Sequence, residues 1–376
     1  MEKPFLHRLT KQIFISSNIF IGVLFLLGAN VKYFDPIKWW FLSLLTLALP
    51  YLLLLLLLFL LFWLFKRSYW CIVSILVIAL SLHAVRNIFP LNFSTGFSLA
   101  KQPGNIRVMS WNVELFNILH YKDHPEAKQK MFDLINKYDP DIACFQEVVA
   151  GENKKAINYF PDIHNALRFK DYLYSYQLRD DFDRYHHFGI TIFSKFPIIR
   201  KQTIVNNPNN YNSTFQFVDV IAGNDTLRIF NIHLQSLKFS KENLKYLDNG
   251  SIQTDATTES KSVISKIKTG IIKRAFQAFF IKDEMNHSPY PLIVCGDFND
   301  VPVSYAYETI GKDLQNSFVQ KGTGISRTFS GISPTLRIDN IFTDKNFIIE
   351  QFTRVRQLLS DHFPIITDIK FEPNHR

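Results

Sequence analysis

The chain has 376 residues, enough for one domain of roughly 250 residues and a shorter accessory region. Its formal net charge of +9 is concentrated near the N-terminus, because residues 1–100 hold eight Lys and Arg against two acidic residues. Of the chain's 42 basic and 33 acidic side chains, 34 and 31 lie beyond residue 100, so the charge of the larger part gives no argument for a polyanionic partner.

Three apolar runs near the N-terminus predict three membrane-spanning helices. They cover about residues 12–31, 39–65 and 68–88, and charged side chains are absent from the first two and from 68–85. A helix of about 20 residues rises about 30 Å, the thickness of a bilayer's hydrocarbon. Splitting the second run at Pro50 would leave two halves too short to cross. A cleaved signal peptide is the alternative for the first run, which lacks a small-residue cleavage site.

Basic residues flank these runs at alternate ends. Lys3, Arg8 and Lys11 precede the first run, and Lys66 and Arg67 separate the second from the third. The positive-inside rule assigns both segments to the cytoplasm. We therefore expect an integral membrane protein whose larger domain is extracytoplasmic, with the bilayer as a partner. The sequence gives no evidence of a protein partner.

Residues 1–91 are thus expected to form the membrane region, and residues 92–104, rich in Gly, Ser and Pro, a linker. Short apolar runs alternate with polar segments over residues 105–372. Strands are predicted at 106–113, 141–148, 189–195, 215–222, 226–234, 291–298, 337–344 and 364–371, and helices at 127–138 and 263–279. Because strands outnumber helices, we predict two packed sheets flanked by helices, an α/β sandwich.

Polar side chains lie at or beside the ends of six predicted strands. They are Asn112 and Glu114, Gln146 and Glu147, Asn231, His233 and Gln235, Asp297 and Asn299, Asp339 and Asn340, and Asp361 and His362. Any one of these groups alone is typical of a turn or of a structural polar residue. Six groups together indicate a shared rim, because the strand ends of a sheet converge, and polar groups at the mouth of a core cost free energy unless they are needed there.

The rim's side chains indicate a reaction. Glu147, Asp297, Asp339 and Asp361 would repel one another and any anionic substrate. A hard divalent cation removes this repulsion, and oxygen ligands favour Mg²⁺ or Mn²⁺ over zinc. Amide and imidazole groups can bind phosphoryl oxygens, a carboxylate such as Asp297 can deprotonate water, and a histidine can exchange a proton with the leaving oxygen. Metal-assisted phosphoester hydrolysis is the predicted chemistry.

Seven ordered motifs resemble those of the endonuclease/exonuclease/phosphatase superfamily, which includes DNase I-like nucleases and neutral sphingomyelinases. They are WNVELF, FQEV, FGITIFSKFPI, NIHLQS, GDFNDVP, RIDNIF and SDHFPI, and the resemblance covers about residues 105–372. The resemblance implies a catalytic domain with a four-layer, DNase I-like α/β sandwich of two mixed sheets, and membrane-anchored bacterial members have a similar layout. Asn340 departs from the aromatic residue that many members place there, but Asp339 is retained.

The resemblance also implies metal ligands and a site for the attacking water. Glu147 would be the principal Mg²⁺ ligand, with Asn112 beside it and Asp361 as a further metal contact. Asp297 and Asn299 would position the attacking water and hold the phosphoryl group.

The histidines complete the implied catalytic set. His233 would act across the phosphate as general acid or transition-state donor, and His362 would contact the phosphate, oriented by Asp339. Asn231, Asn299 and His362 are the candidate substrate-binding residues. The resemblance leaves open which histidine is the acid and whether one or two metals bind.

The sequence thus predicts a membrane-anchored, Mg²⁺-dependent phosphoesterase, a metal-dependent hydrolase with nucleic acid as its first candidate substrate. A lipid phosphodiesterase of the sphingomyelinase type is an alternative, because the anchor keeps the site near headgroups and nucleases generally need a broad basic groove. A small-molecule phosphatase is another. A non-catalytic, membrane-tethered binding protein is the alternative of a different class, and the complete set of chemical groups argues against it.

Overall fold

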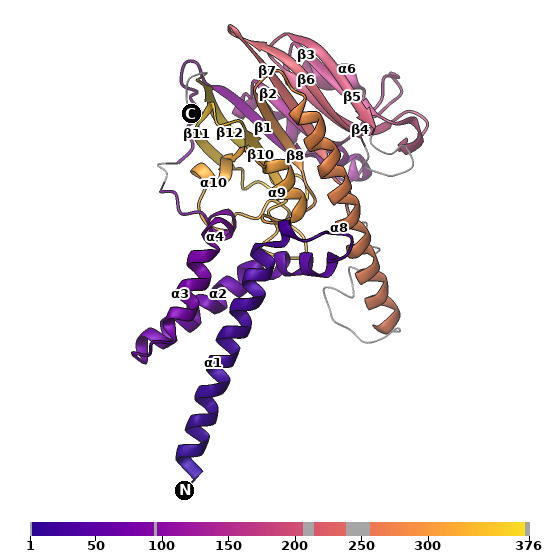
Figure 1. Cartoon of the computed structure of the whole chain (residues 1–376). Coiled ribbons are helices and arrows are strands. Elements are labelled where there is room, and N and C mark those ends of the chain that lie inside the picture. Colours follow the sequence, from indigo (N-terminus) through magenta and orange to yellow (C-terminus); the bar gives the residue numbers. More distant parts are fainter. Residues whose placement is uncertain (1, 94–95, 206–213, 238–255, 373–376) are drawn as a thin grey trace.

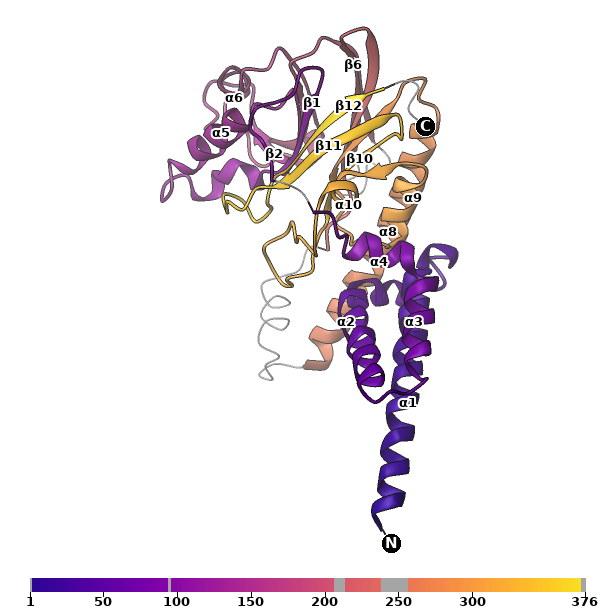
Figure 2. The ribbon, with the colours of Figure 1, turned by 90° about the vertical axis from the view of Figure 1, so that its left-hand side faces the viewer.

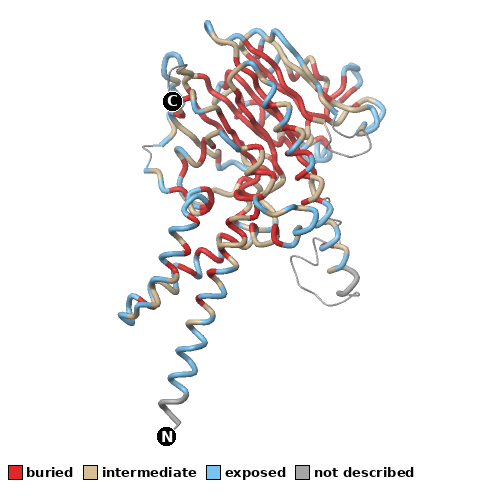
Figure 3. Tube along the Cα trace, in the orientation of Figure 1, coloured by how far each residue is buried: buried red, intermediate tan, exposed pale blue. Residues whose placement is uncertain are grey.

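The N-terminal helices stand at one end of a domain of packed β-sheets, the sandwich domain (Figure 1). The structure is a computed structural model, and it describes residues 2–93, 96–205, 214–237 and 256–372. Buried residues are concentrated along the strands, whereas much of the first helix is exposed (Figure 3). The two parts therefore differ in how much of their surface is buried within the protein.

Four α-helices and two short 3-10 helices form the N-terminal part. Their bounds are α1 Glu2–Ala29, η1 Val31–Tyr33, η2 Trp40–Ser43, α2 Leu44–Phe65, α3 Cys71–Leu80 and α4 Leu82–Ile88. Among the described residues, Leu6–Ala29 and Trp40–Phe65 are each long and apolar enough to cross a membrane. The second helix runs through Pro50 without a break, as predicted.

The third predicted span is not one continuous helix, and this expectation is corrected. The chain bends by 78° between α3 and α4, so the pair makes a third span only if both parts are counted together. The bend at Ser81 turns α4 onto the sandwich domain. There Asn87 accepts hydrogen bonds from Tyr307, at 2.8 Å on its side chain, and from Arg337 on its backbone oxygen. The straight part of the third apolar run therefore ends at Leu80, and the helix after it contacts the sandwich domain through polar groups.

Two six-stranded mixed sheets form the centre of the sandwich domain. The first has the strand order β11-β12-β1-β2-β4-β3, and the second β5-β6-β7-β8-β10-β9. The strands are β1 Ile106–Asn112, β2 Ile142–Ala150, β3 Asp171–Tyr176, β4 His187–Ser194, β5 Ile198–Val205, β6 Thr214–Ala222, β7 Asp225–His233, β8 Leu292–Asp297, β9 Gln315–Asn316, β10 Asp339–Thr343, β11 Phe347–Arg354 and β12 Ile365–Phe371. The pairs β1–β2 and β7–β8 are parallel, and the other pairs are antiparallel.

Helices cover the outer faces of both sheets, which gives four layers (Figures 1 and 2). The helices are η3 Glu114–His120, α5 Ala127–Tyr138, α6 Phe160–Leu167, η4 Leu178–Asp180, α8 Ala256–Asn286, α9 Tyr305–Gly311 and α10 Ser317–Lys321. Alternation along each strand divides the core, because successive side chains point to opposite faces. Val108 and Cys295 pack between the sheets, Trp111 packs towards α5 and α6, and Val294 packs towards α8 and α9. The predicted fold class is confirmed.

All eight predicted strands are present, and they are the inner strands of the two sheets. The four strands without a prediction, β3, β5, β9 and β11, are the edges. Edge strands carry more polar and charged side chains, as in "IIRKQTIV" of β5. Their hydrophobic pattern is correspondingly weak.

The helix α9 docks the sandwich domain onto the N-terminal helices through one buried carboxylate. Glu308 accepts hydrogen bonds from Lys32, which follows α1, at 2.9 Å, and pairs with His83 of α4 at 2.8 Å. Burial raises the pKa of Glu308, but the hydrogen bonds from His83 and Lys32 lower it by more. The pKa of Glu308 is therefore below its usual value. The ionised carboxylate is therefore the form that holds the two parts together.

This contact predicts a pH dependence. Because the pKa of Glu308 is lower when docked than when exposed, its stabilisation is present above pH 4.5, the ordinary glutamate value, and is lost as the pH falls through the lowered pKa. The thermal unfolding midpoint of the detergent-solubilised protein should fall between about pH 5 and about pH 3, and less in Glu308→Gln. Glu350→Gln, on the exposed surface of β11, is the control. Equal pH dependence in Glu308→Gln and wild type would contradict the assignment.

Candidate active site

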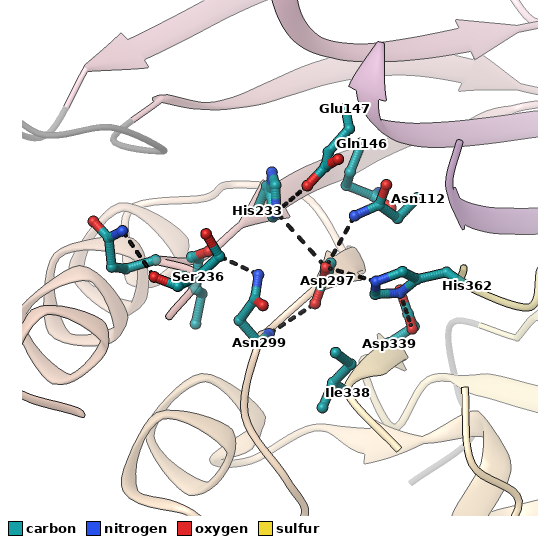
Figure 4. A network of polar contacts seen from close by, with 12 residues as sticks. Asn112, Gln146, Glu147, His233, Ser236, Asp297, Asn299, Ile338, Asp339 and His362 are labelled. Carbon is teal, nitrogen blue, oxygen red and sulfur yellow. Dashed lines mark hydrogen bonds and ion pairs between the residues drawn. The ribbon is translucent and has the colours of Figure 1, made fainter. Parts of the chain in front are cut away.

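Strand pairing gathers the predicted polar residues around Asp297 (Figure 4). The parallel pairing of β7 and β8 sets His233 beside Asp297, and the antiparallel pairing of β10 and β8 sets Asp339 on its other side. From the facing sheet, Asn112 at the end of β1 donates a hydrogen bond to Asp297 Oδ2 at 3.1 Å. Side chains from both sheets thus meet at one rim.

Asp297 is almost fully buried, with an exposure of 1%. The backbone N–H of Asn299 donates to its Oδ1 at 2.8 Å. His233 Nε2 and His362 Nε2 lie 3.6 and 3.7 Å from its Oδ2. Burial raises the pKa of Asp297 more than the charge of His362 lowers it. A carboxylate in this setting can accept a proton from a neighbouring group.

His362 and Asp339 form a hydrogen-bonded pair. His362 Nδ1 lies 2.9 Å from Asp339 Oδ2, and the Thr328 hydroxyl accepts the Asp339 backbone N–H at 3.0 Å. Burial alone would lower the pKa of His362, but the charges of Asp339 and Asp297 outweigh it and raise the pKa to about 10. The ring is therefore protonated on both nitrogens, and its Nε2–H is directed towards Asp297.

His233, on the other side of Asp297, is neutral rather than charged. His233 is buried at the end of β7, and its Nε2 lies 3.6 Å from Glu147 Oε1 as well as from Asp297. Burial lowers its pKa to about 4, in spite of the charge of Asp297. The rim thus holds one neutral and one charged imidazole on either side of a carboxylate.

A β-bulge directs Glu147 into the rim. The register between β2 and β4 shifts between Phe145 and Val148, and Glu147 has a φ of +53°. Bulges of this kind re-aim side chains beside functional sites. Burial raises the pKa of Glu147 more than His362 lowers it, and Asp297 raises it too.

Asn231 lies inside the sandwich rather than at the rim. It is fully buried, donates to the backbone oxygens of Phe145 and Thr191, and accepts from Gln146 at 2.7 Å. All of its side-chain polar atoms are used in holding β2 and β4 to β7. A structural role fits this position better than the expected contact with substrate.

Asn299 also binds inward, since its side-chain amide donates to the Leu234 oxygen at 3.0 Å. Its backbone φ is +49°, a conformation that turns the chain sharply after Asp297. Next to it, Asp300 is bonded to Arg274 of α8 at 3.0 Å. The hydrogen bond of Asn299 and the ion pair of Asp300 thus hold the chain after β8 in place.

Glu114 lies at the rim, where the sequence placed it without assigning it a role. Its carboxylate accepts the backbone N–H of Asp361 at 2.8 Å. Burial, together with the charges of Glu114, Glu147 and Asp297, raises the pKa of Asp361 to about 7, although His362 lowers it. The signal was the position of Glu114 two residues after Asn112, in the same motif.

The rim fits a hard divalent cation. Carboxylate oxygens of Asp297 and Asp339 lie within 4.8 Å of one another. Asp339 Oδ1 is buried and has no hydrogen-bond partner among the described residues. Burial, with smaller contributions from neighbouring carboxylates, raises the pKa of Asp297, Glu147 and Asp361, so their ionised forms are costly in the protein alone. A cation held here would give the free oxygen a partner and would lower the cost of the ionised carboxylates.

A model of the endonuclease/exonuclease/phosphatase family matches residues 109–362, more than half of the chain. The chain belongs to this family. It is a hydrolase of phosphoric ester bonds, as the resemblance of its motifs implied. A model for a domain of unknown function matches residues 11–88. No curated protein matches the chain.

Several solved structures share the fold. An endonuclease/exonuclease/phosphatase family protein from Bacteroides thetaiotaomicron has a TM-score of 0.53 at 18% identity, covering 74% of this chain and 99% of that one. A family member from Bacteroides vulgatus has 0.52 at 19%, covering 71% and 99%. The mannosyl-6-phosphatase of Bacteroides thetaiotaomicron has 0.50 at 18%, covering 71% and 100%. At these identities, the likeness shows the fold.

The position of Asn231 predicts a loss of stability on truncation. Asn231→Ala would leave the Gln146 amide and the backbone oxygens of Phe145 and Thr191 buried without this partner, at a cost of about 1–3 kcal/mol for each group left unsatisfied. Thermal unfolding of the purified protein measures it, with Asn286→Ala, at the exposed end of α8, as control. Wild-type stability combined with lost turnover would instead assign Asn231 to the substrate.

Proposed function

We propose that the protein is a membrane-anchored, divalent-metal-dependent phosphoesterase that hydrolyses phosphodiester bonds by attack of water. The observation that carries the proposal is the setting of Asp297, a buried carboxylate flanked by two histidines and facing further carboxylates. A structural role alone would not require a charged histidine, a neutral histidine and a bulged glutamate around one group. Family membership supplies the reaction class.

Asp297 is the proposed base. The Asn112 amide and the Asn299 backbone N–H fix its two oxygens, so the carboxylate is held in one orientation. It takes a proton from water as the water oxygen forms its bond to phosphorus. The bond from phosphorus to the leaving oxygen breaks, that oxygen takes up a proton from solvent, and Asp297 later returns its proton to solvent. The products are a phosphomonoester and an alcohol.

The histidines act on the phosphoryl group. Asp339 holds His362 by Nδ1, which leaves the Nε2–H to donate to a phosphoryl oxygen. His233 lies on the other side of Asp297 and is placed to contact the leaving oxygen. These roles agree with those implied by the sequence motifs.

Glu147, Asn112 and Asp361 are the proposed holders of Mg²⁺, or of Mn²⁺, near the buried group of Asp297, Asp339 and His362. When bound, the cation would neutralise charge on the phosphoryl oxygens and orient the water. Glu147 is partly exposed, with 26% of its side chain accessible, and Asp361 is also of intermediate burial, so both can meet an arriving ion.

The helices support an extracytoplasmic placement of the domain. The end of α1 that carries Arg8 and Lys11, and the turn with Lys66 and Arg67 after α2, both lie away from the sandwich domain (Figure 1). Basic ends on one side are what the positive-inside rule associates with the cytoplasm. Nucleic acid was the first substrate expected from sequence, and a lipid phosphodiester the second.

Asp297→Asn and His362→Asn should each lower turnover of a generic phosphodiester by about 10²–10⁴, because each removes a group that moves or donates a proton. Initial rates with bis(4-nitrophenyl) phosphate measure this. The matched control is Asp133→Asn, on the exposed side of α5, with wild-type rates expected. Wild-type turnover in Asp297→Asn would refute the proposed base.

Chelation should abolish activity, and Mg²⁺ should restore it. Glu147→Gln should raise the Mg²⁺ concentration needed for half-maximal activity, because it removes one charge from the proposed ligand set. Calorimetric titration with Mg²⁺ alone provides a readout that does not depend on turnover. Full activity in the presence of chelator would exclude the metal role.

A further inference from the structure

The rim lies at the end of the sandwich domain that faces the N-terminal helices. Val303, six residues after Asp297, is buried in the hydrophobic cluster formed by the helices, which includes Phe25 and Leu49. Six residues reach at most about 20 Å. Figures 1 and 2 show α9, which follows this segment, between the sheets and the ends of α1 and α2.

One stretch of chain touches both the helices and the rim. We call residues 322–338, between α10 and β10, the bridging segment. On the side of the helices, Gly324 donates its N–H to the Pro90 oxygen at 2.9 Å, and the Ser333 hydroxyl lies 3.1 Å from the Tyr51 hydroxyl of α2. Arg337 donates to the Asn87 oxygen of α4.

The same segment forms a wall of the rim. The Phe329 ring lies 5.0 Å from the His362 ring, and the two residues form a β-bridge. Ser330 donates its N–H to the Asp361 oxygen at 2.7 Å. Phe329 is four residues from Ser333, so the wall of the rim and the contact with α2 are separated by about 14 Å of chain at most.

Exposed apolar side chains lie on this side of the rim. Tyr51 lies within the apolar stretch Trp40–Phe65, among exposed leucines of α2. Ile332, next to Ser333, is 51% exposed and has a φ of +59°, a conformation that is costly for a β-branched residue. Leu358, four residues before His362, is 65% exposed. Strain and exposure at an apolar residue are explained if its side chain enters lipid.

From these contacts we infer that the substrate is a phosphoester carried by a lipid of the bilayer that holds the helices. This inference rests on the proposed phosphoesterase function. Because Tyr51 lies within the span Trp40–Phe65, its contact with Ser333 brings the bridging segment to the bilayer. The rim then opens beside the headgroup layer, which is roughly 5–8 Å deep on each side. The phosphate of a phospholipid lies in this layer, and its acyl chains stay beside α2 and Ile332 while water cleaves the phosphodiester bond.

Nucleic acid fits this position less well. To reach the rim it would have to lie against the membrane surface, whose anionic lipids repel a polyanion. The part of the chain beyond residue 100 has too small a basic excess to offset this repulsion. We therefore place a lipid phosphoester ahead of nucleic acid, the reverse of the order expected from sequence.

The test uses the full chain reconstituted in bilayers, with Asp297→Asn as the blank. Vesicles each containing one phospholipid class, or sphingomyelin, are compared with glycerophosphocholine, bis(4-nitrophenyl) phosphate and single- and double-stranded DNA. We expect one lipid class to be hydrolysed with a kcat/KM at least about 100-fold above that of every water-soluble phosphodiester, a difference of about 2.7 kcal/mol.

A variant tests the apolar contact. Ile332→Asp should lower the ratio of lipid to water-soluble turnover about tenfold. The fold should tolerate it, because Asp adopts a positive φ more readily than Ile does. The matched control is Ile199→Asp on β5, an exposed apolar residue at the end of the sheet away from the rim, for which the ratio should not change.

The outcomes separate the two proposals. Hydrolysis of DNA or of water-soluble phosphodiesters at a rate equal to or above that of every lipid overturns the inference and leaves the phosphoesterase function standing. An unchanged ratio in Ile332→Asp overturns the assigned contact with lipid. Wild-type turnover no higher than that of Asp297→Asn, on every substrate, overturns the proposed function itself.

Discussion

The buried carboxylate of Asp297 is the constraint on which the rest of the site depends. A carboxylate withdrawn from water costs several kcal/mol unless charges and hydrogen-bond donors replace the solvent. The pairings of β7 and β10 with β8 supply His233 and, through Asp339, His362, whereas the facing sheet supplies Asn112. These partners meet only when the two sheets pack in one register. The packing of the two sheets therefore determines the arrangement of the chemical groups at the rim.

Rigidity of the rim comes from backbone conformations that a free chain rarely adopts. Glu114, Glu147 and Asn299 all have positive φ values, and such positions cost about 1–3 kcal/mol each. They persist because the surrounding sheets hold them. The buried contact between Gln146 and Asn231 fastens the bulge of β2 to the other sheet. Groups aimed in this way need little rearrangement when a phosphate arrives.

Sequence patterns predicted what burial controls and missed what local geometry controls. The inner strands were found because both of their faces are apolar, and the edge strands were missed because solvent and charge dilute the pattern, as in β5. Motif order found the rim residues. An asparagine can either bind substrate or hold the core together, and the sequence does not distinguish the two roles for Asn231. Its hydrogen bonds to the backbone oxygens of Phe145 and Thr191 show that its side chain points inward. The bend at Ser81 depends on tertiary contacts of α4, which hydropathy does not report.

The joint between the two parts of the chain bears on how a substrate reaches the rim. A flexible linker would let the domain rotate freely above the membrane and would suit a diffusing ligand. The observed joint is instead built from an ion-pair cluster at Glu308, the packing of Val303 among the helices and the bridging segment. Contacts of this number and burial fix the direction of the rim relative to α1 and α2. A fixed direction is an advantage when the substrate is held at one depth, since its phosphate then meets Asp297 and His362 without a search over orientations.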